Sequence, residues 1–131
     1  MSSISNSDLE SLDKKINEDE YLYRGIIDIN WDFNNNRPSS AAFKDSKGVS
    51  VDRDARRKEK DCVDFLNSKK DFFAICKVQA KDIKQRNAII NYLPNENNIY
   101  HSEIHNSVDI IQMKGSKPKK IRDDSIVVYK S

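Results

Sequence analysis

The apolar residues of this chain fall in short clusters, and each cluster is long enough for one strand or one helix face. Turn-forming segments separate the clusters, most clearly residues 34–38 (Asn-Asn-Asn-Arg-Pro) and 45–48 (Asp-Ser-Lys-Gly). No apolar run approaches the roughly 20 residues that span a bilayer, and the first residues lack a secretory signal pattern. The 131 residues therefore predict one domain with one core, in a cytoplasmic protein.

Two periodicities alternate along the chain. We expect strands over residues 21–27, 41–44, 49–51, 72–78, 88–93, 99–105, 108–113 and 125–129, and helices over 52–67 and 80–86. A capping box at Ser7 and Glu10 predicts an amphipathic N-terminal helix within residues 1–19. Together these elements predict a single α+β domain over 1–131, with a mixed or mostly antiparallel sheet of about six strands and two or three helices.

Arg24 lies in the middle of an apolar run, where an unpaired guanidinium would be costly. It must therefore reach a carboxylate such as Asp52, backbone carbonyls, or a phosphate-bearing ligand. Ser39 and Ser40 follow a proline in a turn, where their hydroxyls either satisfy local backbone groups or bind a ligand. Arg24, Ser39, Ser40 and His101 are our candidate ligand-binding residues, and we expect them to share one pocket.

His101, Glu103 and His105 are two residues apart from one another, so a strand would place all three on one face. Two imidazoles and a carboxylate are a chemically suitable set for a divalent metal, but no fourth ligand accompanies them. We therefore expect a polar face, with no metal and no cofactor. Cys62 and Cys76 lack a metal-binding spacing and are expected to be buried free thiols.

Four lysines surround a glycine and a proline near the C-terminus: Lys114, Lys117, Lys119 and Lys120. Residues 114–120 are expected to form a flexible basic loop, which is a candidate contact for nucleic-acid phosphates.

Four segments carry a resemblance to a small uncharacterised bacterial family: 22–26 (LYRGI), 37–44 (RPSSAAFK), 49–53 (VSVDR) and 101–105 (HSEIH). That family has an early Arg-x-Ile, then Ser-Ser-Ala-Ala-Phe, Leu-Ser-Val-Asp and a late His-x-x-Ile. The chain departs from it at Ile27-Asp28, where the family has His-Pro, and at Val49, where it has Leu. The resemblance implies no activity.

The order Arg24, Ser39 or Ser40, Glu103 also resembles the Arg-Ser-Glu arrangement of ADP-ribosyltransferases. That resemblance implies that Arg24 would hold NAD, a serine would shape the nicotinamide pocket, and Glu103 would be catalytic. His101 stands where that family usually has Gln or Glu.

We therefore expect a non-enzymatic protein of bacterial or phage origin that binds a ligand or a protein partner, as an accessory of a defence or toxin-immunity locus. Two alternatives are an ADP-ribosyltransferase-like NAD-binding protein and a nucleic-acid-binding module that uses the lysine loop. Whether the protein is an enzyme is left open by the sequence.

Overall fold

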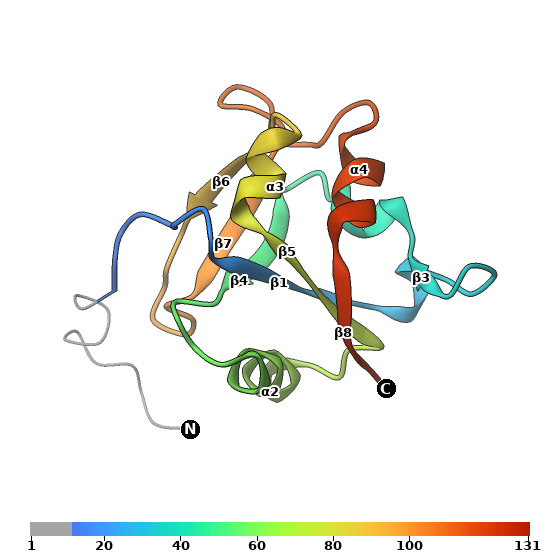
Figure 1. The fold of residues 1–131 in the computed structure, drawn as a ribbon, viewed down its shortest axis with the longest axis horizontal. Coiled ribbons are helices and arrows are strands. Elements are labelled where there is room, and N and C mark those ends of the chain that lie inside the picture. The colour runs from blue at the N-terminus through green and yellow to red at the C-terminus, as the bar shows by residue number, and fades with distance from the viewer. Residues whose placement is uncertain (1–11) are drawn as a thin grey trace.

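In the computed structural model, which describes residues 12–131, six strands form one antiparallel sheet (Figure 1). Its order is β6-β7-β4-β1-β5-β8, so β6 and β8 are the two edges. The strands are β1 (Tyr21–Ile26), β4 (Val49–Arg53), β5 (Ala74–Gln79), β6 (Ile89–Tyr92), β7 (His101–His105) and β8 (Ile126–Lys130). The predicted α+β class and the sheet of about six mostly antiparallel strands are confirmed.

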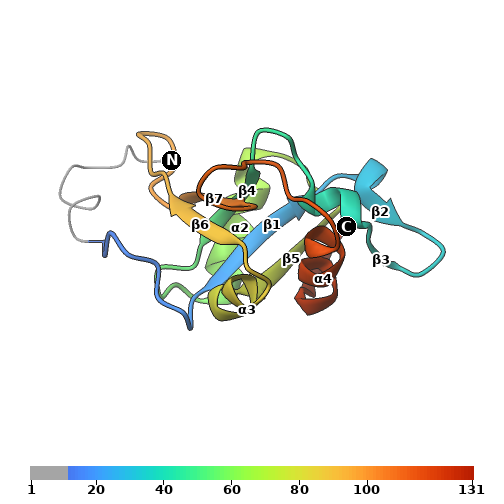
Figure 2. The same ribbon diagram turned by 90° about the horizontal axis from the view of Figure 1, so that it is seen from above.

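A small two-stranded hairpin, β2 (Trp31–Asp32) and β3 (Arg37–Pro38), projects from one end of the molecule (Figure 2). It is flanked by two short 3-10 helices, η1 (Asp28–Asn30) and η2 (Ser40–Phe43). The described residues also contain three α-helices, α2 (Glu59–Lys69), α3 (Ala80–Gln85) and α4 (Lys117–Asp124). None of these helices is long and apolar enough to cross a membrane.

The helices cover opposite faces of the sheet (Figure 1). One face packs against η2, α3 and α4, and it forms the larger core around Leu22, Phe43 and Ile104. We call it the α3–α4 face. The other face packs against α2 through Tyr23 and Ile75, and we call it the α2 face. Successive residues of a strand alternate between the two faces, so the register decides which side chains can meet.

Several predicted elements differ from the observed ones. Residues 40–43 form η2 instead of a strand, and residues 108–113 form bends that leave Val108 exposed. The helix predicted from residue 52 begins at Glu59, because β4 continues to Arg53 and the next residues turn through the left-handed Ala55 and Arg56. Residues 12–19 of the predicted N-terminal helix form bends and turns, and the remainder of that prediction lies outside the described residues.

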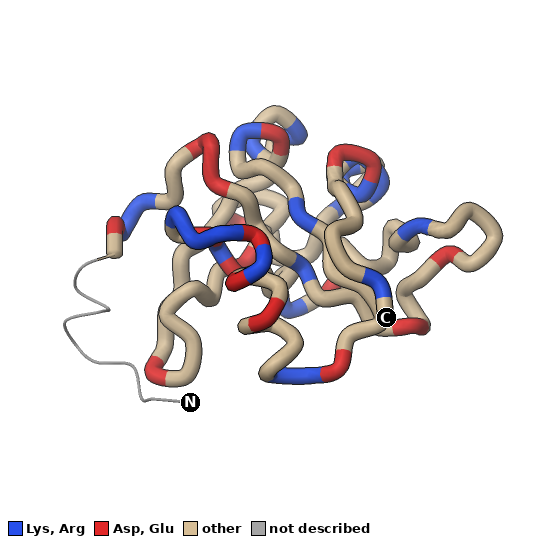
Figure 3. The backbone as a smooth tube through the Cα atoms, turned by 60° about the horizontal axis from the view of Figure 1, so that its bottom comes forward, with Lys and Arg blue, Asp and Glu red and all other residues tan. Residues whose placement is uncertain are grey.

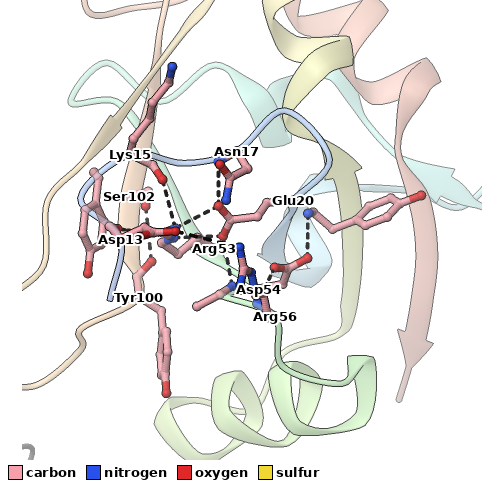
Figure 4. A network of polar contacts seen from close by, with 12 residues as sticks. Asp13, Lys15, Asn17, Glu20, Arg53, Asp54, Arg56, Tyr100 and Ser102 are labelled. Atoms are coloured by element: carbon pink, nitrogen blue, oxygen red, sulfur yellow. Dashed lines mark hydrogen bonds and ion pairs between the residues drawn. The ribbon is translucent and has the colours of Figure 1, made fainter. Parts of the chain in front are cut away.

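A buried ion pair fastens the segment before β1 to the sheet (Figure 4). Arg53, only 2% exposed, donates from Nε and Nη2 to the two carboxylate oxygens of Glu20 at 2.9 and 2.8 Å. The backbone N–H groups of Asn17 and Ala55 also donate to Glu20. Burial alone would raise the pKa of Glu20, but these donors outweigh it and hold the pKa below the ordinary value of 4.5.

Both cysteines are buried free thiols, as the sequence predicted. Burial raises the pKa of Cys62 to about 11 and that of Cys76 to about 12. Because the thiolate is the reactive form, the folded protein is expected to resist a disulfide-exchange reagent at mildly alkaline pH. Reagent absorbance should report both thiols only after unfolding in denaturant, and rapid labelling of the folded protein would contradict this.

Candidate functional site

Arg24 binds the main chain instead of an acidic side chain. Its Nε donates to the carbonyl of Ala42 in η2 at 3.0 Å, and Nη1 donates to the carbonyl of Ser50 in β4 at 2.9 Å. The β1–β4 register consists of Leu22 with Arg53 and Tyr23 with Asp52. The Arg24 side chain therefore joins the two strands beyond the point where their backbones pair. Its burial lowers the pKa of the guanidinium from the ordinary value of 12.5.

The serine turn lies near Arg24 but makes its own local contacts. Ser39 donates from both its N–H and its hydroxyl to the carbonyl of Asn30, at 2.8 and 3.0 Å. Ser40 is exposed at the start of η2, two residues before the carbonyl that binds Arg24. Both serines thus belong to the η1–η2 end of the fold.

His101 is not part of that cluster, and the expected shared pocket is wrong. The register aligns Tyr23 with Asp52 and Asp52 with His101, so these three side chains lie on the α2 face. Arg24 follows Tyr23 in β1 and is directed to the opposite, α3–α4 face. For the same reason Arg24 cannot pair with Asp52. Nor can it share one nucleotide pocket with Glu103, which lies on the His101 side of the sheet.

The four lysines are not in one flexible loop. Lys117, Lys119 and Lys120 are in helix α4, and Lys117 donates from Nζ to the carbonyls of Asn87 and Asn106. Lys114, Lys119 and Lys120 are exposed. Charges of both signs are interspersed along the described chain (Figure 3), so these lysines are not part of a large surface of one sign.

His101, Glu103 and His105 lie side by side along β7, as the sequence predicted, and we call them the imidazole row. His105 Nε2 lies 2.9 Å from Glu103 Oε1, and His101 Nε2 lies 3.4 Å from Glu103 Oε2. On the other side of its ring, His105 Nδ1 accepts from the Asn91 amide at 3.0 Å. That contact requires an unprotonated Nδ1, so Nε2 carries the proton and donates to Glu103.

Asp52 is directly opposite His101 in the neighbouring strand and is only 3% exposed. Its Oδ1 accepts from the Asn98 side chain at 2.8 Å, whereas its Oδ2 is buried with no hydrogen-bond partner among the described residues. Burial raises the pKa of Asp52, although Asn98, Arg57 and His101 oppose the increase. Asp52 and Glu103 are diagonal neighbours, because Glu103 is opposite Ser50, two residues before Asp52.

Gly48 fits closely against the row. Its φ of +100° is in the left-handed region that favours glycine, and an added Cβ would lie 2.6 Å from Glu103 Oε1. Ser50 is exposed and directly opposite Glu103. The row and its surroundings therefore combine side chains and close backbone from β4, β6 and β7.

This arrangement limits the chemistry that the row can perform. No group of three His, Cys, Asp or Glu side chains within 12–131 is arranged to hold a metal ion. A serine nucleophile would need a hydrogen bond to its base, and Ser50 makes none with either imidazole in the described contacts. Neither Asp52 nor Glu103 forms an ion pair with a Lys or Arg among these residues, although the charges of Arg57 and Lys69 act on Asp52, so the row and Asp52 are rich in hydrogen-bond acceptors.

Sequence reasoning found the row but missed Asp52, Asn91 and Gly48 as its neighbours. The period of two along residues 101–105 was a sufficient signal for the row itself. The other three come from β6, from β4 and from the turn before β4, and only strand pairing brings them to β7.

Comparisons with protein-family models, with curated proteins and with solved structures found no match to this chain.

Proposed function

We propose that this protein is a ligand-binding protein that holds an amine or guanidinium group at the imidazole row, next to the buried Asp52. The observation that carries the proposal is the pair of diagonal carboxylates, Asp52 and Glu103, neither of which forms an ion pair with a Lys or Arg of residues 12–131. Two neighbouring carboxylates of like charge repel each other, and a ligand cation beside them removes that repulsion.

The hydrogen-bonding capacity of the row supports the same ligand class. Each carboxylate oxygen can accept more than one hydrogen bond, and Glu103 receives its close contacts from the two imidazoles. Amines and guanidinium groups supply several donors and no acceptors, which matches this surplus. The row is partly exposed, with 21% of the Glu103 side chain accessible, so such a group can reach it from solvent.

The proposal predicts binding of agmatine, a probe with an amine and a guanidinium group. The chain has two histidines, and both are in the row, so NMR signals of the imidazole rings report on this site alone. Agmatine should shift both sets of signals to saturation, whereas a neutral alcohol of the same length should not. If excess agmatine leaves the NMR signals of both imidazole rings unshifted, the proposed function is rejected.

Variants localise the binding and set its pH dependence. Asp52→Asn and Glu103→Gln should each weaken agmatine binding by about tenfold, the equivalent of about 1.4 kcal/mol. Asp109→Asn, which alters an exposed carboxylate outside the row, serves as the matched control. A cation favours the ionised form of Asp52, so affinity should fall as the pH is lowered through the raised pKa of that group. If Asp52→Asn and Glu103→Gln bind agmatine as tightly as the control Asp109→Asn, the proposed site is contradicted.

A further inference from the structure

A hollow of about 570 Å³ opens at the end of the sheet near the C-terminus, away from the imidazole row. It lies where the end of β8, the start of β5 and the end of α2 meet. Phe72, Phe73 and Tyr129 supply aromatic side chains to its wall. Concave sites with aromatic walls are the usual places where a protein takes up an apolar group.

Exposed apolar side chains also follow the lining residues Ile27 and Asp28 along the chain, in η1 and in the turn between β2 and β3. Ile29 is 80% exposed and Phe33 is 68% exposed. The Phe33 ring lies edge-on to Phe73, with 5.5 Å between ring centroids, and Trp31 contacts Phe73 from another direction at 5.4 Å. We call the hollow and these side chains the hairpin hollow. Adjacent exposed side chains of this size mark interaction surfaces more often than isolated ones do.

The charges of the hairpin hollow indicate the chemistry of its partner. Asp28 and Asp71 line it together with Lys70, and Lys130 Nζ lies over the rings of Trp31 and Phe73, so the two carboxylates are matched in number by two ammonium groups. Neither aspartate is in an ion pair with another described residue, since every such pair in 12–131 involves other carboxylates. A Lys or Arg next to an apolar residue would complement these carboxylates and the aromatic wall.

The neighbouring sheet edge indicates the conformation of that partner. β8 is an edge strand, so its outer backbone groups have no neighbouring strand in the six-stranded sheet. Its Ile126 and Val127 are exposed, and Tyr129 at its far end lines the hollow. An uncovered apolar edge is a template for an added strand, and it leads directly to the hairpin hollow.

We propose that the hairpin hollow and the outer edge of β8 together bind an extended segment of a protein partner, which adds a strand to the sheet. The segment carries an apolar side chain that enters among Phe72, Phe73 and Tyr129. A neighbouring Lys or Arg lies by Asp28 and Asp71. This site is separate from the imidazole row and does not depend on the ligand proposed there.

A library of random peptides displayed on phage, selected on the 131-residue chain, tests the proposal. The enriched peptides should share an apolar residue beside Lys or Arg. Synthetic copies should change the fluorescence of Trp31, which is the chain's only tryptophan and contacts the wall of the hollow. Hydrogen exchange should show new protection of the β8 backbone amides in the complex.

Matched variants distinguish specific binding at the hairpin hollow from nonspecific binding to exposed apolar side chains. Phe33→Ser should weaken binding of the synthetic peptide by about tenfold or more. Val108→Ser removes an even more exposed apolar side chain outside the hairpin hollow and should leave binding unchanged. Asp71→Asn should weaken binding, whereas Asp109→Asn should not. Failure to enrich peptides, equal binding by Phe33→Ser and wild type, or a complex without protected β8 amides would each overturn the proposal.

Discussion

Replacing Glu20 with Gln is expected to lower the free energy of unfolding by about 3–5 kcal/mol, which denaturant titration would measure. The substitution keeps the shape of the side chain but leaves the Arg53 guanidinium buried without its counter-charge. Removing one partner of a buried pair costs far more than replacing both, because the remaining charge cannot be solvated. The double variant Glu20→Leu, Arg53→Met should therefore recover part of the loss.

The same ion pair makes the free energy of unfolding depend on pH in the acidic range. The pKa of Glu20 is lower in the folded protein than in the unfolded chain, so its contribution is fully present above the unfolded value. That contribution is lost as the pH falls through the lowered folded pKa. The difference in stability between wild type and Glu20→Gln should therefore shrink in acid.

Asp64→Asn is the control, because it breaks the exposed Lys60–Asp64 pair and should cost much less. Equal losses for Glu20→Gln and Asp64→Asn at neutral pH would show that the Glu20–Arg53 network does not hold the segment before β1.

Replacing Arg24 with Ala is expected to lower the free energy of unfolding by about 2–4 kcal/mol. The change removes two charge-assisted hydrogen bonds and leaves the carbonyls of Ala42 and Ser50 without that donor. Arg24→Lys should recover less than half of the loss, because one ammonium group cannot reproduce two diverging donors. Thermal or denaturant unfolding followed by circular dichroism measures both.

Arg37→Ala is a suitable control, since Arg37 is half exposed and its ion pairs with the described aspartates are long, at 3.9 and 4.0 Å. The comparison also separates two roles of Arg24. Unchanged stability for Arg24→Ala would contradict the structural role and return Arg24 to the list of ligand-binding candidates. A large loss, with agmatine binding retained in the fraction that stays folded, would confirm that Arg24 supports the fold and is not part of the imidazole row.

Short elements show where sequence patterns fail. Residues 41–44 are mostly apolar and residues 108–113 include three β-branched residues, both suited to strands, yet the first segment forms η2 and the second forms bends. A strand needs a neighbour for its backbone groups, and the strands nearest to these two segments in the sequence are already paired on both sides, β4 with β1 and β7, and β7 with β4 and β6. Helix α2 begins later than predicted for a related reason, because residues 52 and 53 are paired with other strands in the sheet.

The candidate site divides in the same way. The alternation in β7 was readable from residues 101–105, since it depends only on the local geometry of a strand. The separation of Arg24 from His101 could not be predicted from the sequence. It depends on which residue of β1 pairs with Asp52, and the sequence pattern does not specify whether that residue is Tyr23 or Arg24. A shift of one residue in that pairing would have placed Arg24 opposite Asp52, on the same face of the sheet as the row.

By itself the sequence determined the α+β class, the buried thiols and the line of His101, Glu103 and His105, because each follows from local periodicity or composition. Only the tertiary structure decided three contacts. Asp52 lies next to His101, Arg24 donates to main-chain carbonyls on the other face of the sheet, and Glu20 forms an ion pair with Arg53. Those three outcomes depend on contacts between segments that are far apart in the chain. The contacts follow from how the strands pair, and local sequence patterns do not specify the register of that pairing.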